Sequence, residues 1–471
     1  MKLKPNWTLG IMSTVLVFIL AACGGDSTPT SPPASQADPA FPTVAAQPAT
    51  SASPATSVPA DVPVVKEAAK ATSAPTAVET APVSSDDPSE LAKGESKQGS
   101  EAEGSNVNRP LVAADPGFRE ELSSSGIRTG GWETDFSFHT VPFDSILSRG
   151  PPRDGIPPID NPTFVDIKDA DEWLEALEPV VSFELNGDTR AYPLQILMWH
   201  EIMNDTVGGA PVSVTFCPLC NSAIVFDRNF NDLVLTFGTS GMLRNSDLIM
   251  WDRQTETWWQ QLTGEGIIGQ LAGHKLTFIP AQIISCQDFK AANPKGQVLS
   301  RDTGLGRRYG QNPYAGYDRV DNPPFLFDRV IDGRLLPKER VVTVTIGDVE
   351  AAFPFSVLAK EGTINYNVGG TDLAVFFKPG TRSALDSGNI ADSNKIGAAG
   401  LFDATLEGTK YTFKNEGDKI VDNETGSIWS IQGEAVEGPL AGKKLTPVVH
   451  TNSFWFAVAA FKPDTKIYQG K

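Results

Sequence analysis

Cysteine is scarce in this sequence, with only 4 among 471 residues. That number is too small for a fold of this size to be held together by a dense set of disulfides. Basic residues are also few, 39 against 57 acidic ones, so the formal net charge is -18. This charge excludes a protein that binds nucleic acid through its phosphate groups. After the first 22 residues, no apolar run is long enough to span a bilayer.

The first residues have the features of a secretion signal. Lys2 and Lys4 precede an apolar run from 9 to 22, and the string L-A-A-C ends at Cys23. A basic start before a short apolar run predicts a signal peptide over 1–22. The string resembles the bacterial lipobox, in which the cysteine is lipidated. We therefore expect lipid on Cys23 to hold the protein at the extracytoplasmic face of the cell membrane. The alternative is an ordinary signal peptide that is cleaved nearby.

The segment from 23 to 107 has the composition of a tether. It consists mainly of Ser, Thr, Ala and Pro, and its only aromatic residue is Phe41. Residues 24 to 107 contain 12 of the 36 prolines. Such a segment cannot bury enough apolar surface to offset the entropy that ordering would cost, so we expect it to be disordered.

The rest of the chain aligns with itself in an ordered series of matches, at offsets of 161, then 176, then about 170. The matched pairs include Pro193 with Pro354, Asn204 with Asn365, 207–209 with 368–370, Phe226 with Phe402, Asp252 with Asp422, and Trp259 with Trp429. This order predicts an internal duplication. We expect a domain over 108–336 that contains the first copy (core 178–300) and a connecting segment, and a second, degenerate copy over 337–471.

Each copy has the pattern of a β-rich fold. Apolar residues alternate over 180–183 and 341–346, which is typical of strands, and Asn186-Gly187 predicts a tight turn. Pro193 suits the first position of a short helix over 194–199. Further strands are expected at 212–216, 233–237, 373–377 and 410–413. The predicted fold class is β-rich α+β, in two tandem copies after a disordered tether.

The first copy has a C-P-L-C motif, Cys217 to Cys220, that the second copy replaces with Lys-Pro-Gly-Thr. Two thiols at this spacing form a redox couple, supply two soft ligands to a metal ion such as copper or zinc, or close an inert disulfide. These three alternatives stay open. Attachment of c-type haem is excluded, because Asn221 stands where that motif needs histidine. A thioredoxin fold is disfavoured, because 223–226 reads as a strand where that fold has a helix.

His200 and Glu201 are further candidates for catalysis, and His200 for metal binding. They follow the predicted helix, and His200 lies opposite Glu361 of the second copy. The pair is not the H-E-x-x-H zinc motif, because Asn204 occupies the second histidine position. The competing interpretation is a hydrogen-bonded histidine of the core. Cys286 is either a buried apolar cysteine or a third ligand.

Residues 238 to 247 form a glycine-rich segment that is longer than its counterpart in the second copy. We expect a loop that folds over the cysteines and either cradles an anion or makes a plain turn. The polar and aromatic residues expected to line a pocket here are Ser240, Arg244, Asn245, Asp247, Asp252 and Trp259. Between the copies, 301–304 and 309–314 suit either a pocket wall or a rigid linker.

Several long strings resemble a prokaryotic family known as domain of unknown function 3179. They are W-H-E-I-M-N-D (199–205), V-T-F-C-P-L-C-N-S-A (214–223), F-G-T-S-G (237–241), the stretch 245–261 and D-T-G-x-x-x-x-Y-G (302–310), with G-P-P-R-D-G-I-P-P-I-D-N-P (150–162) upstream. The resemblance covers about 130 to 320 and implies no established activity. Cys286 departs from the family, where we expect an aromatic residue.

The leading hypothesis is an extracytoplasmic lipoprotein with a site for thiol redox or soft-metal chemistry at Cys217 and Cys220, near His200. The alternative is a non-catalytic ligand-binding or cell-surface module in which the cysteines form a structural disulfide. The sequence names no substrate and does not decide whether the protein is an enzyme. The expected partners are the membrane, through Cys23, and a small molecule, metal ion or protein thiol.

Overall fold

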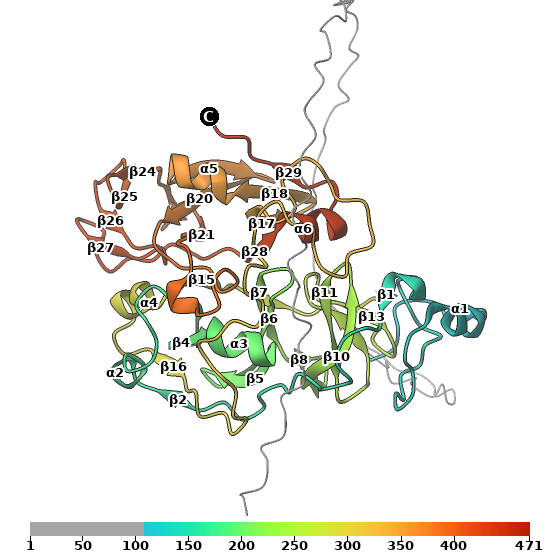
Figure 1. Cartoon of the computed structure of the whole chain (residues 1–471). Helices are drawn as coiled ribbons and strands as arrows, with labels where there is room; N and C mark the ends of the chain where they lie inside the picture. Colours follow the sequence, from blue (N-terminus) through green and yellow to red (C-terminus); the bar gives the residue numbers. More distant parts are fainter. Residues whose placement is uncertain (1–107) are drawn as a thin grey trace, which may run out of the picture. The chain divides into compact units, whose positions relative to one another are not determined.

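The computed structural model of the chain describes residues 108–471. The predicted signal peptide, Cys23 with its expected lipid, and the expected tether lie outside the described residues. Strands predominate among the described elements and the helices are short, so the prediction of a β-rich fold is confirmed (Figure 1). No helix in the described range is both long enough and apolar enough to span a bilayer.

A tight hairpin forms the centre of the first sheet. Strands β3 (Pro179–Leu185) and β4 (Asp188–Pro193) are joined by Asn186 and Gly187, whose φ angles are 52° and 79°. These two residue types adopt positive φ most readily, so the predicted two-residue turn is confirmed. The sheet has the order β15-β3-β4-β16-β2. The outer strands are β2 (Phe164–Val165), β15 (Gln282–Ser285) and β16 (Gln297–Leu299).

Two further sheets lie in the first half of the folded chain, with the orders β14-β7-β6-β5 and β1-β10-β11-β12-β13. The strands of the former are β5 (Ile202–Val207), β6 (Ala210–Cys217), β7 (Ser222–Asp227) and β14 (Phe278–Ile279). Those of the latter are β1 (Ile146–Leu147), β10 (Phe237–Arg244), β11 (Asp247–Asp252), β12 (Trp258–Gln260) and β13 (Glu265–Ile268). A small hairpin pairs β8 (Asn229–Phe230) with β9 (Leu233–Val234).

The second half contains sheets of the orders β28-β17-β18-β29, β19-β20-β21, β24-β25-β26-β27 and β22-β23. The first of these contains β17 (Arg340–Ile346), β18 (Val349–Pro354), β28 (His450–Phe454) and β29 (Lys466–Ile467). The next two contain β19 (Ile364–Val368), β20 (Thr371–Lys378), β21 (Ala398–Asp403), β24 (Phe413–Glu416), β25 (Lys419–Asp422), β26 (Ile428–Trp429) and β27 (Ala435–Glu437). The last pairs β22 (Thr405–Leu406) with β23 (Thr409–Lys410).

Short helices connect or cap the strands. They are α1 (Phe118–Ser125), α2 (Ile167–Ala170), α3 (Leu194–His200), α4 (Cys286–Ala292), α5 (Phe355–Glu361) and α6 (Trp455–Phe461). Two 3₁₀ turns span Phe143–Ser145 and Ile390–Asp392. Pro193 is the N-cap of α3 and not its first helical residue, because it still pairs with Val180 in the ladder of β3 and β4.

Three sequence expectations about strands and loops change in the structure. The strand expected at 233–237 is divided between β9 and the start of β10, and that at 410–413 between β23 and β24. The segment 238–247 is not a loop, because residues 238–244 belong to strand β10, residues 245–246 form a tight turn, and Asp247 begins strand β11. Its glycines fit an irregular strand instead, with a shift of register between Thr239 and Met242.

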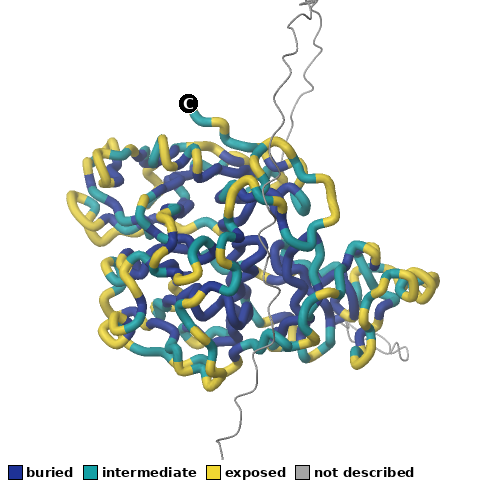
Figure 2. The backbone as a smooth tube through the Cα atoms, in the orientation of Figure 1, coloured by how far each residue is buried: buried dark blue, intermediate teal, exposed yellow. Residues whose placement is uncertain are grey.

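The largest core cluster draws on both halves of the chain. It contains Val214 and Phe216 of β6 together with Ala384, Leu385 and Phe454 from the second half. The backbone N–H of Phe454 also donates to the carbonyl of Cys220 over 2.8 Å. Buried residues follow the strands, and exposed ones lie mainly at the connecting turns (Figure 2). The second half therefore covers the turn that carries the C-P-L-C motif.

Candidate functional site

The two cysteines of C-P-L-C lie at the end of one β-hairpin. Cys217 is the last residue of β6 and pairs with Ser222, the first residue of β7, while Cys220 lies in the turn between them. Asn221 completes the turn with a φ of 54°, a conformation that asparagine tolerates better than most residues. The hairpin therefore places both thiols at the same end, where they are free and buried.

A second hairpin reaches the cysteines from the neighbouring sheet. Arg244 of β10 pairs with Asp247 of β11, and the two residues between them, Asn245 and Ser246, have φ angles of 51° and 66°. Two consecutive positive φ values are typical of a type I′ turn. The carbonyl oxygen of Ser246 then accepts from the thiol of Cys220 over 3.4 Å and from that of Cys217 over 3.9 Å.

Asp247 joins the two thiols in one cluster. The ligand atoms of Cys217, Cys220 and Asp247 all lie within 4.8 Å of one another. Oδ2 of Asp247 accepts from the Gln260 side chain over 2.6 Å and from the Leu262 backbone over 2.9 Å. Its other oxygen, Oδ1, is buried and has no hydrogen-bond partner among the described residues. The cluster thus offers two sulfurs and one unused carboxylate oxygen to a common point.

Burial controls the electrostatics of this cluster, since all three side chains are at most 2% exposed. Burial raises the pKa of the Cys217 thiol, and it raises that of Cys220 far above its usual range. Burial also raises the pKa of Asp247 to about 6, although its hydrogen-bond donors oppose the shift. No lysine or arginine in the described part of the chain forms an ion pair with Asp247. A bound cation would supply the missing positive charge.

Glu201 lies beside the cluster in a strained conformation. It follows α3 directly with a φ of 57°, whereas Gly362 follows α5 with a φ of 72°. A residue other than glycine in such a region costs about 1–3 kcal/mol. Burial, followed by the charge of Asp247, raises the pKa of Glu201 to about 8. Glycine would adopt this backbone conformation without strain. The presence of a buried glutamate instead indicates a role for its side chain.

His200 is placed apart from this cluster. Its Nδ1 lies 2.8 Å from the carbonyl of Pro157 and its Nε2 lies 2.7 Å from the hydroxyl of Tyr309. Burial lowers the pKa of its ring to about 4, so the ring is neutral near pH 7. A neutral imidazole with both nitrogens in hydrogen bonds has no lone pair left for a metal ion. The third candidate ligand beside the two cysteines is therefore Asp247 and not His200.

The remaining predicted pocket residues have structural contacts. Ser240 donates to the carbonyl of Ile249, and Arg244 contacts Ser145 and lies over the ring of Phe461. Asp252 accepts from the indole N–H of Trp259 over 2.9 Å, and it also accepts from the backbone N–H of Thr255. Most of the glycine-rich segment forms strand β10, which has a shift of register between Thr239 and Met242. Of this set, only Asp247 lies at the cysteines, and Asn245 belongs to the turn that precedes it.

Cys286 belongs to a different part of the core. It begins α4 and packs in a cluster with Val180, Ile284 and Phe289. Burial raises the pKa of its thiol to about 11. The structure thus places it away from the other two cysteines, as a buried apolar residue.

Two residues at the cluster were not identified from the sequence. Gln260 holds the carboxylate of Asp247, and Tyr317 donates to the carbonyl of Leu219 over 3.1 Å, within the C-P-L-C turn. Gln260 lies in the W-W-Q-Q string, in which only Trp259 was expected to line the pocket. Tyr317 has no local motif, because its role depends on a contact across 98 residues.

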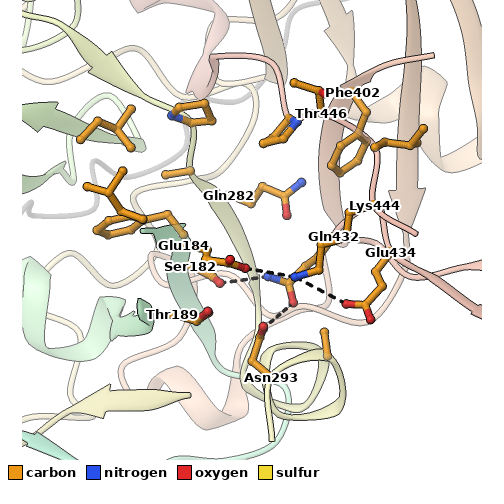
Figure 3. Close-up of a pocket in the computed structure, with 18 of the residues that line it drawn as sticks. Ser182, Glu184, Thr189, Gln282, Asn293, Phe402, Gln432, Glu434, Lys444 and Thr446 are labelled. Carbon is orange, nitrogen blue, oxygen red and sulfur yellow. Dashed lines mark hydrogen bonds and ion pairs between the residues drawn. The ribbon is translucent and has the colours of Figure 1, made fainter. Parts of the chain in front are cut away.

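A cavity of 430 Å³ opens between β3 and the turn that joins β26 to β27 (Figure 3). Its polar side chains are largely paired with one another. Gln432 donates to Ser182 over 3.0 Å and accepts from Asn293 over 2.9 Å, while Lys444 pairs with Glu184 over 3.0 Å. These contacts connect the two halves of the chain and leave few polar groups for a ligand.

The comparisons with known proteins identify one family. The sequence model of a family described as "Protein of unknown function (DUF3179)" matches residues 153–465. The match includes both cysteines and Asp247, and it extends beyond the motif-rich stretch through most of the second half. No curated protein and no solved structure matches the chain. Because the match covers well over half of its length, the chain belongs to this family, DUF3179.

Proposed function

We propose that Cys217, Cys220 and Asp247 bind a soft divalent metal ion, and that zinc fits them best. The observation that carries this proposal is the convergence of three buried ligand atoms within 4.8 Å. Zinc accepts both thiolate sulfur and carboxylate oxygen, usually in a tetrahedral arrangement. Copper(I) is favoured by thiolates alone, so the carboxylate argues for zinc. Three protein ligands would leave a fourth position for water, a substrate or Glu201.

A thiol redox couple is less well supported by the same contacts. Reactive thiols are typically partly exposed and have a lowered pKa. Here both thiols are buried, burial raises the pKa of each, and the nearest charged groups are acidic. An attacking thiolate would therefore be disfavoured, whereas a metal cation would be stabilised by the same acidic surroundings.

The test is to measure the metal content of the purified full-length chain by inductively coupled plasma mass spectrometry, and then to titrate the metal-free chain with Zn²⁺. Cobalt substitution adds a spectroscopic measurement, because Co²⁺ bound to thiolates shows sulfur-to-metal charge-transfer bands. We expect a single metal ion per chain, with affinity falling by more than about 10-fold in Asp247→Asn and in Cys217→Ser.

Cys286→Ser is the matched control, since it also removes a buried thiol but lies in another core cluster. It should leave metal affinity unchanged. A wild-type chain that binds neither zinc nor cobalt, or an Asp247→Asn variant that binds as tightly as the wild type, would contradict the proposal.

We also propose that the protein is a lipoprotein anchored at the extracytoplasmic face of the membrane. The L-A-A-C string that ends at Cys23, after a basic start and an apolar run, supports this. Metabolic labelling with a fatty-acid analogue should mark the wild-type protein and not Cys23→Ser. Equal labelling of both proteins would rule out lipid on this cysteine.

We further propose that the two halves of the folded chain arose by duplication. The ordered sequence offsets support this, as do the corresponding strand orders β15-β3-β4-β16 and β28-β17-β18-β29. In each half the second strand of the hairpin leads directly into a seven-residue helix, α3 or α5. An experimental structure with different strand orders in the two halves would contradict this proposal.

A further inference from the structure

A second cavity, of 600 Å³, lies on the side of the first half where Tyr309 contacts His200. Its charged lining residues are Arg301, Glu175 and Glu178, and Trp173, Tyr309 and Gly310 are among the others. Its volume falls within the range of roughly 300–1,000 Å³ that small-molecule pockets occupy. The segments 301–304 and 309–314, which suited either a pocket wall or a linker, thus contribute to a pocket wall.

Arg301 is the only basic residue that lines this cavity, and its guanidinium is held in one orientation. Nε donates to the side-chain carbonyl of Gln195 over 2.9 Å, and Nη2 donates to the same oxygen. The guanidinium also lies 4.7 Å from the centre of the Trp173 ring. Its hydrogen-bond acceptor is a neutral amide, and Arg301 forms no ion pair with any residue that the structure describes. A fixed, half-buried guanidinium without a carboxylate partner is prepared to bind an anion.

Gly310 keeps the guanidinium open to the cavity. A Cβ atom at this position would lie 3.2 Å from Nη2 of Arg301, and the φ of 91° disfavours any side chain. Glycine therefore permits the close approach of the backbone without covering the charge.

An acidic group lies next to this cation on the same wall. Glu178 is only 3% exposed, and its Oε2 accepts from Nε2 of Gln195 over 2.7 Å while its Oε1 accepts from the backbone N–H of Glu175 over 3.3 Å. The amide of Gln195 therefore separates the carboxylate of Glu178 from the guanidinium of Arg301. A multiply charged anion such as phosphate would be repelled by Glu178, whereas a ligand with one positive and one negative group would satisfy both residues.

We propose that this cavity binds a free α-amino acid. The ligand's carboxylate accepts from Arg301, and its ammonium group faces Glu178. The proposal is independent of the metal site, because none of the residues that line the cavity belongs to the cluster at Cys217. The cavity between the two halves is a weaker candidate, since most of its polar side chains are already paired (Figure 3).

The test is isothermal titration calorimetry of the purified full-length chain with four probes: L-alanine, propionate, ethylamine and inorganic phosphate. We expect L-alanine to bind with a Kd on the order of 1 mM or lower. Propionate lacks the ammonium group and ethylamine lacks the carboxylate, so each should bind at least about 10-fold more weakly. Removal of metal by a chelator should leave alanine binding unchanged.

Three variants assign the binding to this cavity. Arg301→Gln should weaken alanine binding by at least about 10-fold, and Arg301→Lys by less, because lysine keeps the charge but not the fork of donors. Glu178→Gln should weaken the binding of alanine and not that of propionate. Arg253→Gln is the matched control, since Arg253 also lies over a tryptophan but is paired with Asp160; it should bind alanine normally.

The proposal would be overturned if no probe bound the folded wild-type chain, if phosphate or propionate bound as tightly as alanine, or if Arg301→Gln bound alanine normally. The comparison of probes on the wild-type chain keeps the test decisive even where Arg301→Gln fails to fold.

Discussion

The thiol of Cys220 donates a hydrogen bond to the carbonyl oxygen of Ser246 over 3.4 Å. This contact joins two hairpins of different sheets, because Cys220 lies between β6 and β7 and Ser246 lies between β10 and β11. Since Asp247 follows Ser246 directly, the geometry of one two-residue turn decides whether a carboxylate faces the thiols. The proposed metal site therefore depends on the backbone of Asn245 and Ser246.

The first prediction concerns this turn. Asn245→Val places a β-branched residue at a φ of 51°, so we expect the free energy of unfolding to fall by about 1–3 kcal/mol. Metal affinity should fall as well, because the turn positions Asp247. Asn186→Val is the matched control, with a φ of 52° in the distant hairpin of β3 and β4. It should lose similar stability and keep its metal affinity, as measured by chemical denaturation and zinc titration. Equal loss of affinity in both variants would show that the effect is not local.

The second prediction concerns the pH dependence of metal binding. A metal ion binds the thiolates, so both thiols must release their protons when the ion enters. Burial raises the pKa of each thiol, so the protonated form competes throughout the neutral range. We expect zinc affinity to rise with pH, by up to about 100-fold per pH unit for two released protons. Proton release can be measured by calorimetry in buffers of different ionisation enthalpy, and an affinity that does not change between pH 6 and 8 would contradict thiolate ligation.

The third prediction concerns Glu201 and the stability of the metal-free chain. Its folded-state pKa of about 8 lies above the usual carboxyl value, so the folded chain holds the proton more tightly than the unfolded chain does. Stability should therefore fall as pH rises from about 4.5 to 8, and should not fall further above that range. Glu201→Gln should remove this part of the pH dependence, because its amide does not ionise. Thermal unfolding of both proteins across this range measures the effect, and identical pH profiles would contradict it.

A related substitution tests the strain at the same residue. Glu201→Gly should raise the free energy of unfolding by about 1 kcal/mol or more, because glycine adopts a φ of 57° without strain. Gly362 already holds the corresponding place after α5. A loss of stability in Glu201→Gly would show that the glutamate side chain contributes favourable contacts that outweigh the strain.

The fourth prediction separates scaffold from site. Asp252 and Asp422 each accept an indole N–H over 2.9 Å, from Trp259 and from Trp429. Removing either carboxylate leaves a buried donor unsatisfied, so Asp252→Ala and Asp422→Ala should each cost about 1–3 kcal/mol. Neither substitution should change zinc affinity in the folded protein. A selective loss of affinity in Asp252→Ala would instead assign that aspartate to the site.

Local features of the fold were accessible from the sequence because they depend on neighbouring residues. Alternating apolar residues predicted β3 and β17, and Asn186-Gly187 predicted the turn, since backbone geometry couples residues one or two positions apart. The spacing of C-P-L-C likewise determined that Cys217 and Cys220 would lie together at one end of a hairpin. The prediction of a loop rested on the glycines of 238–241 and was wrong, because glycine also occurs in irregular strands.

Only the tertiary structure decided which distant residues meet the cysteines. The sequence placed Asp247 among six expected pocket residues near the cysteines, but it reaches the thiols because two sheets pack so that the tips of their hairpins meet. His200 is directed elsewhere by Pro157 and Tyr309, 43 and 109 residues away along the chain. The sequence thus determined the pair of thiols, and the packing of the sheets determined their third partner, because contacts between sheets depend on the whole core and not on local spacing.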